Sequence, residues 1–337
     1  MLQFGVIGAG RIGRVHVQNL RAGVDGAAAR TLADPFLTEE TAAWALDRGV
    51  RQVTKDYREI LADPEIDAVL ICSSTDTHAP ISLEALAAGK HVFCEKPIDH
   101  DPDRIHAVMA LAARSGLCYQ VGFNRRFDHN YRAVRNAVAE GRIGRPEVIK
   151  ITSRDPEPPP LPYVRVSGGL FMDMMIHDFD MVRYLAGCDA VELFAEAAVL
   201  TDPAIGEAGD VDTAVVTLKM ENGALAVIDN SRRAVYGYDQ RCEVFGSGGM
   251  AASGNDRPST LRLSTADGIR GEKPLWFFLE RYTQAYTDEL RSFVSAITAR
   301  TPVEVTANDG LQPVRMALAA QRSLAERRPV RLSEIPE

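Results

Sequence analysis

Short apolar runs alternate with amphipathic stretches over the first third of the chain. The amphipathic stretches include residues 81–88 and 103–115, where apolar side chains recur at helical spacing. Regular alternation of strand and helix is typical of a parallel sheet with helices on both faces. We therefore predict a doubly wound α/β domain over residues 1–122. Its strands are expected at residues 2–7, 28–33, 50–53, 68–71, 91–94 and 117–121.

The hydrophobic pattern changes after about residue 145. Two strand-like runs, 213–220 and 225–231, flank Asn222-Gly223, a dipeptide typical of a two-residue hairpin turn. They predict a second, α+β domain over residues 123–337 with a mainly antiparallel sheet. The other elements expected in it are strands at 191–200, 241–245 and 261–264 and long helices at 281–299 and 310–326.

A glycine-rich turn follows the first predicted strand. Gly8, Gly10 and Gly13 form the pattern G-x-G-x-x-G, and the next residues continue as a helix. In a dinucleotide site these glycines allow a tight turn, let backbone approach the pyrophosphate and let helix and strand pack closely. Asp34 ends the second strand 21 residues after Gly13, where an acidic residue accepts hydrogen bonds from a ribose. The spacing predicts a dinucleotide site; the alternative is a tight βα turn with a chance Asp34.

The same Asp34 predicts NAD rather than NADP. A carboxylate repels a 2′-phosphate and accepts a hydrogen bond from the free 2′-hydroxyl. Pro35 and Phe36 follow it, so no Arg or Lys stands immediately after Asp34 to receive a phosphate.

A lysine stands at the end of the fifth predicted strand. The strand stops at Glu95-Lys96-Pro97, and parallel sheets bind ligands outside the carboxyl ends of their strands. Pro97 stiffens the turn and fixes the direction of Lys96. The sequence therefore predicts chemistry at Lys96, with a solvated loop lysine as the alternative.

A second group of polar residues follows Gly168-Gly169. The pattern from Met172 to Leu185 is helical, which puts Asp173 and His177 four residues apart on one face. A carboxylate beside an imidazole can orient it and tune its basicity. The alternatives are a surface ion pair and a metal site. No further clustered His or Cys supplies the missing ligands, so we predict no metal.

Composition is that of a globular protein, with 46% hydrophobic and 25% charged residues among 337. The formal net charge of −8 disfavours non-specific nucleic-acid binding. No apolar run is long enough for a membrane span. The first predicted strand begins at residue 2, so we expect no signal peptide. The five cysteines are scattered. A cytoplasmic enzyme fits these features.

Taken together, the glycine loop, Glu95-Lys96-Pro97 and the Gly168-Gly169…Asp173…His177 pattern resemble the glucose–fructose oxidoreductase/inositol dehydrogenase/rhizopine catabolism family. The resemblance covers nearly the whole chain. Within that family, residues 121–128, 176–180 and 236–241 are most similar to inositol 2-dehydrogenases.

The resemblance implies a Rossmann domain, a C-terminal domain with a large open sheet, and often a homotetramer. It also implies NAD-dependent oxidation of myo-inositol to 2-keto-myo-inositol (scyllo-inosose). Lys96, Asp173 and His177 match the family's catalytic positions. The cofactor contacts it implies are Gly8, Gly10, Arg11, Ile12, Gly13, Asp34, Ser74, Thr75, His78, Glu95 and Lys96. The substrate contacts it implies are Asn124, Arg125, Asp155, Asp173, His177 and Tyr236.

Oxidation of a secondary alcohol needs a hydride acceptor and a base at the hydroxyl. We expect His177, oriented by Asp173, to be the base, and Lys96 to bind the same hydroxyl. Three alternatives stay open. They are a dehydrogenase of another inositol isomer or an aldose, a non-catalytic dinucleotide-sensing regulator, and an oxidoreductase that recycles a cofactor it never releases.

Overall fold

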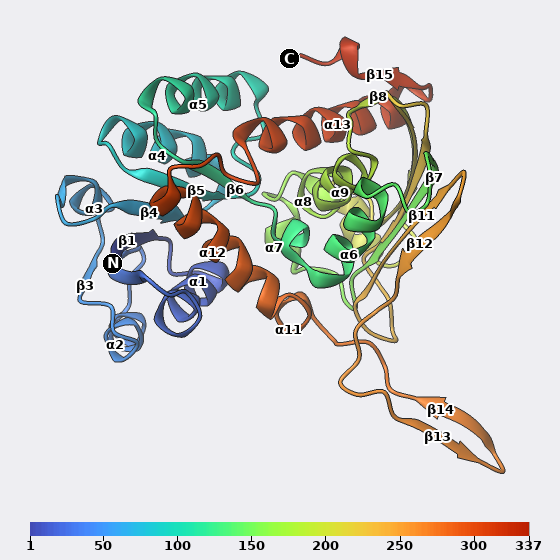
Figure 1. Ribbon diagram of the computed structural model, residues 1–337, viewed down its shortest axis with the longest axis horizontal. Coiled ribbons are helices and arrows are strands. Elements are labelled where there is room, and N and C mark those ends of the chain that lie inside the picture. The colour runs from blue at the N-terminus through green and yellow to red at the C-terminus, as the bar shows by residue number, and fades with distance from the viewer. Residues whose placement is uncertain (337) are drawn as a thin grey trace. The chain divides into compact units, whose positions relative to one another are not determined.

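The computed structural model describes residues 1–336, and the chain divides into two compact units (Figure 1). The first unit comprises Met1–Phe127 and Gln284–Gln312. The second comprises Asp128–Thr283 and residues 313–336. Each unit is built around one sheet of its own.

The first unit holds a six-stranded parallel sheet in the order β3-β2-β1-β4-β5-β6. The chain order reverses between β1 and β4, the switch point at which open α/β sheets bind ligands. The predicted parallel fold is confirmed, with strand ends shifted by up to two residues. The strands are β1 (Leu2–Ile7), β2 (Ala27–Ala33), β3 (Gln52–Thr54), β4 (Ala68–Ile71), β5 (His91–Glu95) and β6 (Tyr119–Gly122).

Helices cover both faces of this sheet. Figure 1 shows α4 (Thr75–Ala87) and α5 (Pro102–Ser115) on one side, and α1 (Arg11–Ala22) with α12 (Thr283–Ala299) on the other. Short elements complete the unit: α2 (Glu39–Asp47), α3 (Arg58–Ala62) and the 3₁₀ turn η1 (Asn124–Phe127).

The position of α12 differs from the expected domain boundary after residue 122. Leu290, Phe293 and Val294 of α12 are buried in the core of the first unit. The Phe293 ring lies 6.2 Å from Phe4 of β1 and 5.9 Å from Phe93 of β5. The chain therefore returns to its first unit after residue 283 and leaves it again after residue 312, and the apolar face of α12 completes the core there.

The second unit holds a seven-stranded mixed sheet in the order β12-β11-β7-β10-β9-β8-β15. Its neighbours are antiparallel except for the parallel pair β7 and β10, so the mainly antiparallel sheet is confirmed. The strands are β7 (Pro146–Arg154), β8 (Ala190–Ala198), β9 (Thr213–Met220), β10 (Leu225–Ser231), β11 (Asp239–Gly246), β12 (Gly249–Ser253) and β15 (Val330–Arg331).

Helices cover one face of this second sheet (Figure 1). Asn230 of β10 donates to Asp178 of α9 at 2.9 Å, and the amide of Ala195 in β8 donates to Ser323 of α13 at 3.0 Å. The helices are α6 (His129–Ala139), α7 (Leu161–Val164), α8 (Gly169–Asp173), α9 (Ile176–Ala186), α10 (Pro203–Glu207), α11 (Phe278–Arg281), α13 (Ala307–Glu326) and the 3₁₀ turn η2 (Leu332–Glu334). Alternation along β9 follows from this arrangement: Val216 and Leu218 are buried, whereas Val215 is exposed.

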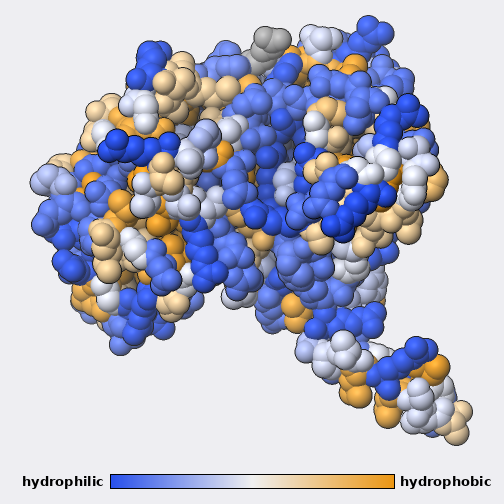
Figure 2. All heavy atoms as spheres, viewed as in Figure 1, coloured by the Kyte–Doolittle hydropathy of each residue, from blue (hydrophilic) through white to orange (hydrophobic). Residues whose placement is uncertain are grey.

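A separate two-stranded hairpin, β13 (Arg262–Thr265) and β14 (Gly268–Gly271), projects from the second unit. All eight of its strand residues are exposed. Figure 2 shows hydrophobic side chains on it, and the exposed apolar residues there are Leu261, Leu263 and Ile269. Within residues 1–336, every helix is too short or too polar to span a bilayer.

A carboxyl group lies in the core of the first unit. Glu289 of α12 is 0% exposed, and neither carboxyl oxygen has a hydrogen-bond partner among the described residues. One of its carboxyl oxygens lies within 4.8 Å of a ring nitrogen of His16 and of a carboxyl oxygen of Glu95. His16 Nε2 and Glu95 Oε1 lie 2.8 Å apart. Burial, and then the charge of Glu95, raise the pKa of Glu289 well above its ordinary value of 4.5. This carboxyl therefore keeps its proton in the folded state at a pH where the unfolded chain has lost it.

Glu289→Gln should remove a pH-dependent loss of stability. Because the folded-state pKa is raised, stability falls as the pH rises above 4.5 and the unfolded state releases the proton. Glutamine has no proton to release. The melting temperature of the variant should therefore rise relative to that of the wild type between pH 5 and pH 8. The matched control is Glu280→Gln, an exposed position on α11. A wild-type pH dependence that Glu289→Gln leaves unchanged would contradict this assignment.

Candidate active site

The glycine loop joins β1 to α1 and leaves no room for a side chain at Gly8 or Gly13. Gly8 has a positive φ of 103°, and its amide donates to the carbonyl of Ala33 at 2.8 Å. A Cβ added at Gly13 would lie 2.0 Å from the carbonyl oxygen of Gly8. At Gly10, in contrast, an added Cβ meets nothing within 4 Å. The packed positions fix the turn, and the open one leaves space at the N-terminus of α1, where a pyrophosphate is stabilised.

Asp34 lies beside this loop, as its spacing predicted. Oδ2 accepts a hydrogen bond from the amide of Ala9 at 2.7 Å, and Oδ1 accepts one from Phe36 at 2.8 Å. A carboxylate oxygen has more than one lone pair, so a ribose hydroxyl can still donate to it. The glycine loop and Asp34 therefore fit the adenosine half of a dinucleotide.

The parallel sheet brings the remaining residues of the first unit to one edge. Ser74 and Thr75 follow β4 and begin α4, Lys96 follows β5, and Asn124 begins η1 after β6. Lys96 is half-buried, and the peptide bond between it and Pro97 is cis. Others placed at this edge are Arg11 and Ile12 in the first turn of α1, Glu95 at the end of β5 and Arg125 in η1.

His78 does not line a cleft. It is 2% exposed, Nδ1 lies 2.8 Å from the carbonyl of Pro97, and Nε2 lies 3.0 Å from the carbonyl of Ser73. Burial lowers its pKa, but the Cys94 sulfur and the two carbonyls outweigh burial and raise the pKa to about 9. Two carbonyl partners require two N–H donors, so His78 is a buried brace for the turn beside Lys96.

In the second unit, Asp155 and Arg232 leave the sheet at the same place. β7 and β10 are parallel neighbours, with Arg154 beside Ser231 in register. The next residues, Asp155 and Arg232, therefore emerge together. The amide of Asp155 donates to the carbonyl of Ser231 at 2.9 Å, which holds the two chain segments against each other.

Asp173 is held from two sides. Its Oδ1 accepts a hydrogen bond from the hydroxyl of Tyr163 at 2.8 Å. Its Oδ2 accepts from both terminal nitrogens of Arg232, at 3.3 and 3.4 Å. Sequence reasoning missed Arg232, because a charged residue two positions beyond Asn230 at a strand end is indistinguishable from a surface arginine such as its neighbour Arg233.

The segment that carries Asp173 and His177 is broken. A single helix from Met172 to Leu185 was expected, but α8 ends at Asp173 and α9 begins at Ile176. The expected i, i+4 geometry on one continuous helix is therefore wrong. From residue 170 to 183, Asp173 and His177 alone are not fully buried. This segment thus presents one carboxylate and one imidazole from an otherwise buried chain.

The hydroxyl of Tyr236 contacts residues other than Asp173. That hydroxyl donates to Asp239 at 2.6 Å and accepts from Arg154 at 3.4 Å. Arg154 pairs with Asp229, on the face of the sheet away from α9. Consecutive strand residues point to opposite faces of a sheet. Tyr236 therefore contacts the face that carries Arg154, whereas Asp155 points to the face nearer Asp173.

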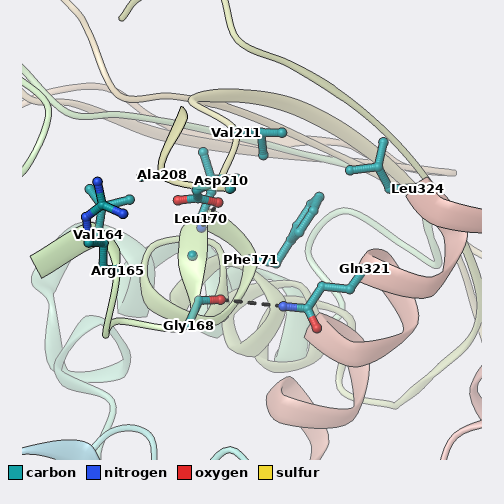
Figure 3. A pocket seen from close by; sticks show the side chains of 12 residues that line it. Val164, Arg165, Gly168, Leu170, Phe171, Ala208, Asp210, Val211, Gln321 and Leu324 are labelled. Carbon is teal, nitrogen blue, oxygen red and sulfur yellow. Dashed lines mark hydrogen bonds between the residues drawn. The ribbon is translucent and has the colours of Figure 1, made fainter. Parts of the chain in front are cut away.

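A cavity of about 300 Å³ lies beside the start of α8 (Figure 3). Gly168, Phe171, Asp210 and Gln321 are among the residues that line it. Gln321 of α13 donates to the carbonyl of Gly168 at 3.4 Å, and Asp210 accepts from the amide of Leu170 at 3.0 Å. The loop before Asp173 is therefore anchored at both sides of this cavity.

Two family models match the chain. One, described as an oxidoreductase family with an NAD-binding Rossmann fold, matches residues 2–123. The other, the GFO/IDH/MocA C-terminal domain, matches residues 131–252. The chain belongs to the GFO/IDH/MocA family. It is an oxidoreductase with an NAD-binding Rossmann domain, as the glycine loop and Asp34 predicted.

Relatives within the family match over nearly the whole chain. A myo-inositol 2-dehydrogenase of Thermotoga maritima is 47% identical over 99% of both chains. The uncharacterized oxidoreductase YrbE of Bacillus subtilis is 51% identical over 97% of this chain and 95% of that protein. The crystal structure of scyllo-inositol dehydrogenase from Lactobacillus casei, with NAD(H) and scyllo-inositol bound, superposes with a TM-score of 0.91 at 31% identity and covers 99% of each chain.

Asp34 should set the preference for NAD over NADP. Wild-type kcat/KM should be higher with NAD, because Asp34 accepts from a ribose hydroxyl and repels a 2′-phosphate. Asp34→Ser with Pro35→Arg replaces the carboxylate and adds a phosphate partner, so the preference should narrow or reverse. Steady-state kinetics with both cofactors measure it, with Asp47→Ser, an exposed carboxylate on α2, as the control. A wild type that prefers NADP would contradict the role of Asp34.

Proposed function

We propose that this oxidoreductase catalyses the NAD-dependent oxidation of myo-inositol to 2-keto-myo-inositol (scyllo-inosose). The observation that carries the proposal is the pair of partly exposed residues, Asp173 and His177, on an otherwise buried segment. An anchored carboxylate and an imidazole suit removal of a proton from a hydroxyl. Two inositol 2-dehydrogenases that are 47% and 46% identical to this chain support a polyol as the substrate.

In the proposed mechanism NAD supplies the acceptor for the hydride that leaves the carbinol carbon. His177 takes the hydroxyl proton as general base. Asp173, fixed by Tyr163 and Arg232, stabilises the imidazolium that results. Lys96 binds the same oxygen and stabilises the negative charge that develops on it.

The other hydroxyls of the polyol need polar partners of their own. Asn124 and Arg125 at the edge of the first sheet and Asp155 at the end of β7 are proposed to supply them. A buried polar group left unpaired penalises a wrong stereoisomer, which gives selectivity. Tyr236 is proposed only as support for this region, since Asp239 and Arg154 already engage its hydroxyl.

A related dehydrogenase of another inositol isomer or an aldose is the second candidate. A scyllo-inositol 2-dehydrogenase of Bacillus subtilis, 34% identical over 97% of this chain, favours it. Myo-inositol and scyllo-inositol differ in the orientation of one hydroxyl, so the loops around Asp155 and Asn124 would decide between them.

We also propose a homo-oligomer, most simply a tetramer, formed through the open face of the second sheet. On this face Val215, Leu225, Phe245 and Met250 are 44%, 53%, 47% and 56% exposed. Exposed apolar side chains on one side of an antiparallel sheet are typical of an interface. The β13–β14 hairpin supports this, because an isolated two-stranded hairpin is marginally stable in water. A second copy of the chain would cover both.

A panel of polyols with NAD tests the proposed activity directly. We expect myo-inositol to give the highest kcat/KM for NADH formation among myo-, scyllo- and chiro-inositol, glucose and galactose. A higher value for another member of the panel would select the second candidate. No NADH with any polyol, despite NAD binding, would contradict the proposed function and favour a dinucleotide-sensing protein.

His177→Ala should slow the chemical step without weakening cofactor binding. We expect kcat to fall by roughly 10²–10⁴, the usual contribution of a positioned base, with NAD affinity near wild type. Asp173→Asn should lower kcat less, and Lys96→Ala should lower kcat with some loss of NAD affinity. The rise of kcat/KM with pH through neutrality should disappear in His177→Ala. Wild-type turnover in that variant would remove His177 as the base.

The mass in solution tests the oligomer. Light scattering at micromolar concentration should give several times the monomer mass of 36.8 kDa. Leu225→Asp puts a charge on the open sheet face and should shift the mass toward the monomer, because burying an unpaired charge is costly. Leu46→Asp on α2, 50% exposed against 53% for Leu225, is the matched control. A wild-type protein of monomer mass would refute the assembly.

A further inference from the structure

One arginine lies at the centre of the carboxylates of the second unit. Arg232 is 1% exposed, among the least exposed of the large side chains. Its terminal nitrogens lie within 3.4 Å of Asp173 Oδ2 and 3.9 Å from both Asp155 Oδ2 and Asp210 Oδ2. Three carboxylates from three separate chain segments thus share one guanidinium.

The chemistry of the guanidinium suits this arrangement. Its donors lie in a rigid planar fork, so one side chain can meet oxygens in several directions at once. An ammonium group is a compact point charge without that fork. Without the guanidinium of Arg232, the three carboxylates would lie close together and would repel one another.

The backbone holds Arg232 independently of these side chains. Its amide donates to the carbonyl of Asp212 at 2.9 Å. The carboxylate of Asp212 in turn accepts from the amides of Leu200, Thr201 and Asp202, at 2.8, 2.8 and 3.0 Å. Burial raises the pKa of Asp212, but these three amides outweigh it and lower the pKa to about 2. The residue whose carbonyl anchors Arg232 is therefore itself held by three backbone amides.

We propose that Arg232 is a positioning residue: its buried guanidinium fixes the orientations in which Asp173 and Asp155 meet the substrate. The proposal rests on the function proposed above. In that function Asp173 orients the base and Asp155 contacts the substrate. Arg232 would thus set the orientation of both carboxylates without touching a reacting atom. Tyr163 holds the other oxygen of Asp173 and limits its movement.

A double-mutant cycle between Arg232 and Asp173 tests the proposal. Arg232→Met should lower kcat by about 10²-fold, the cost of a misplacement of about 1 Å, and leave the Kd for NAD unchanged. Because Arg232 acts through Asp173, the double variant Arg232→Met/Asp173→Asn should be no slower than the slower single variant. Arg233→Met, the exposed neighbour, should behave as wild type. Losses that multiply in the double variant would overturn the proposal.

Arg232→Lys protects the test against misfolding. It keeps a positive charge in the buried site but loses the fork, so it should retain part of the activity lost in Arg232→Met. If Arg232→Met does not fold, the cycle is run with Arg232→Lys and Asp173→Asn. Full wild-type kcat in Arg232→Lys would show that charge alone suffices, which overturns a positioning role.

Crystal structures separate this proposal from the proposed function. In Arg232→Met or Arg232→Lys the carboxylate of Asp173 should lie displaced from its wild-type position, whereas Arg233→Met should leave it in place. An unmoved carboxylate overturns the positioning role whatever the substrate is. If the wild type oxidises no polyol but Asp173 moves, the proposed function fails while the structural role of Arg232 stands.

Discussion

The close approach of α1 to the end of β1 is the constraint on which the first unit depends. Gly13 lies so near the carbonyl of Gly8 that a Cβ there would be 2.0 Å from the oxygen. This contact fixes the direction of α1, and with it the amides that face a pyrophosphate. Asp34 is tied to the same loop through Ala9, at 2.7 Å. Since all six strands are parallel, Lys96 and Asn124 emerge at the same edge.

Buried ionisable side chains lie close to the residues for which chemistry is proposed. Glu289 lies under the motif that carries Lys96, and Arg232 lies under Asp173. Neither arrangement serves stability well, because a buried carboxyl without a hydrogen bond and a buried ion pair both carry a desolvation cost. The presence of Arg232 is understandable if it fixes the carboxylate of Asp173. Stability is then reduced locally in exchange for orientation, as is common at functional sites.

Local signals in the sequence predicted those parts of the fold that depend on neighbours in the chain. β1, β4, β9 and β10 begin and end where their hydrophobic runs do, and the glycine loop with Asp34 follows from spacing alone. The place of α12 could not be predicted in this way. Periodicity shows that residues 283–299 form a helix with one apolar face, but not which of two sheets that face covers.

The same limit explains what was missed at the site. The break between α8 and α9 leaves no gap in the hydrophobic pattern, so one helix was expected. The contacts of Arg232 join residues 59 and 77 positions apart in sequence, to Asp173 and Asp155, and only the parallel pairing of β7 and β10 brings them together. His78 was assigned by position to the cofactor, yet the carbonyls of Ser73 and Pro97 occupy both its nitrogens.

We propose that this protein transfers a hydride from the carbinol carbon of an inositol to NAD. This transfer is tested most directly by oxidising myo-inositol that carries deuterium at carbon 2 and analysing the reduced cofactor by mass spectrometry. The account predicts one deuterium per reduced nicotinamide, together with a slower turnover than with unlabelled substrate. Reduced cofactor without deuterium would contradict it, because the hydride would then have come from another position or another molecule.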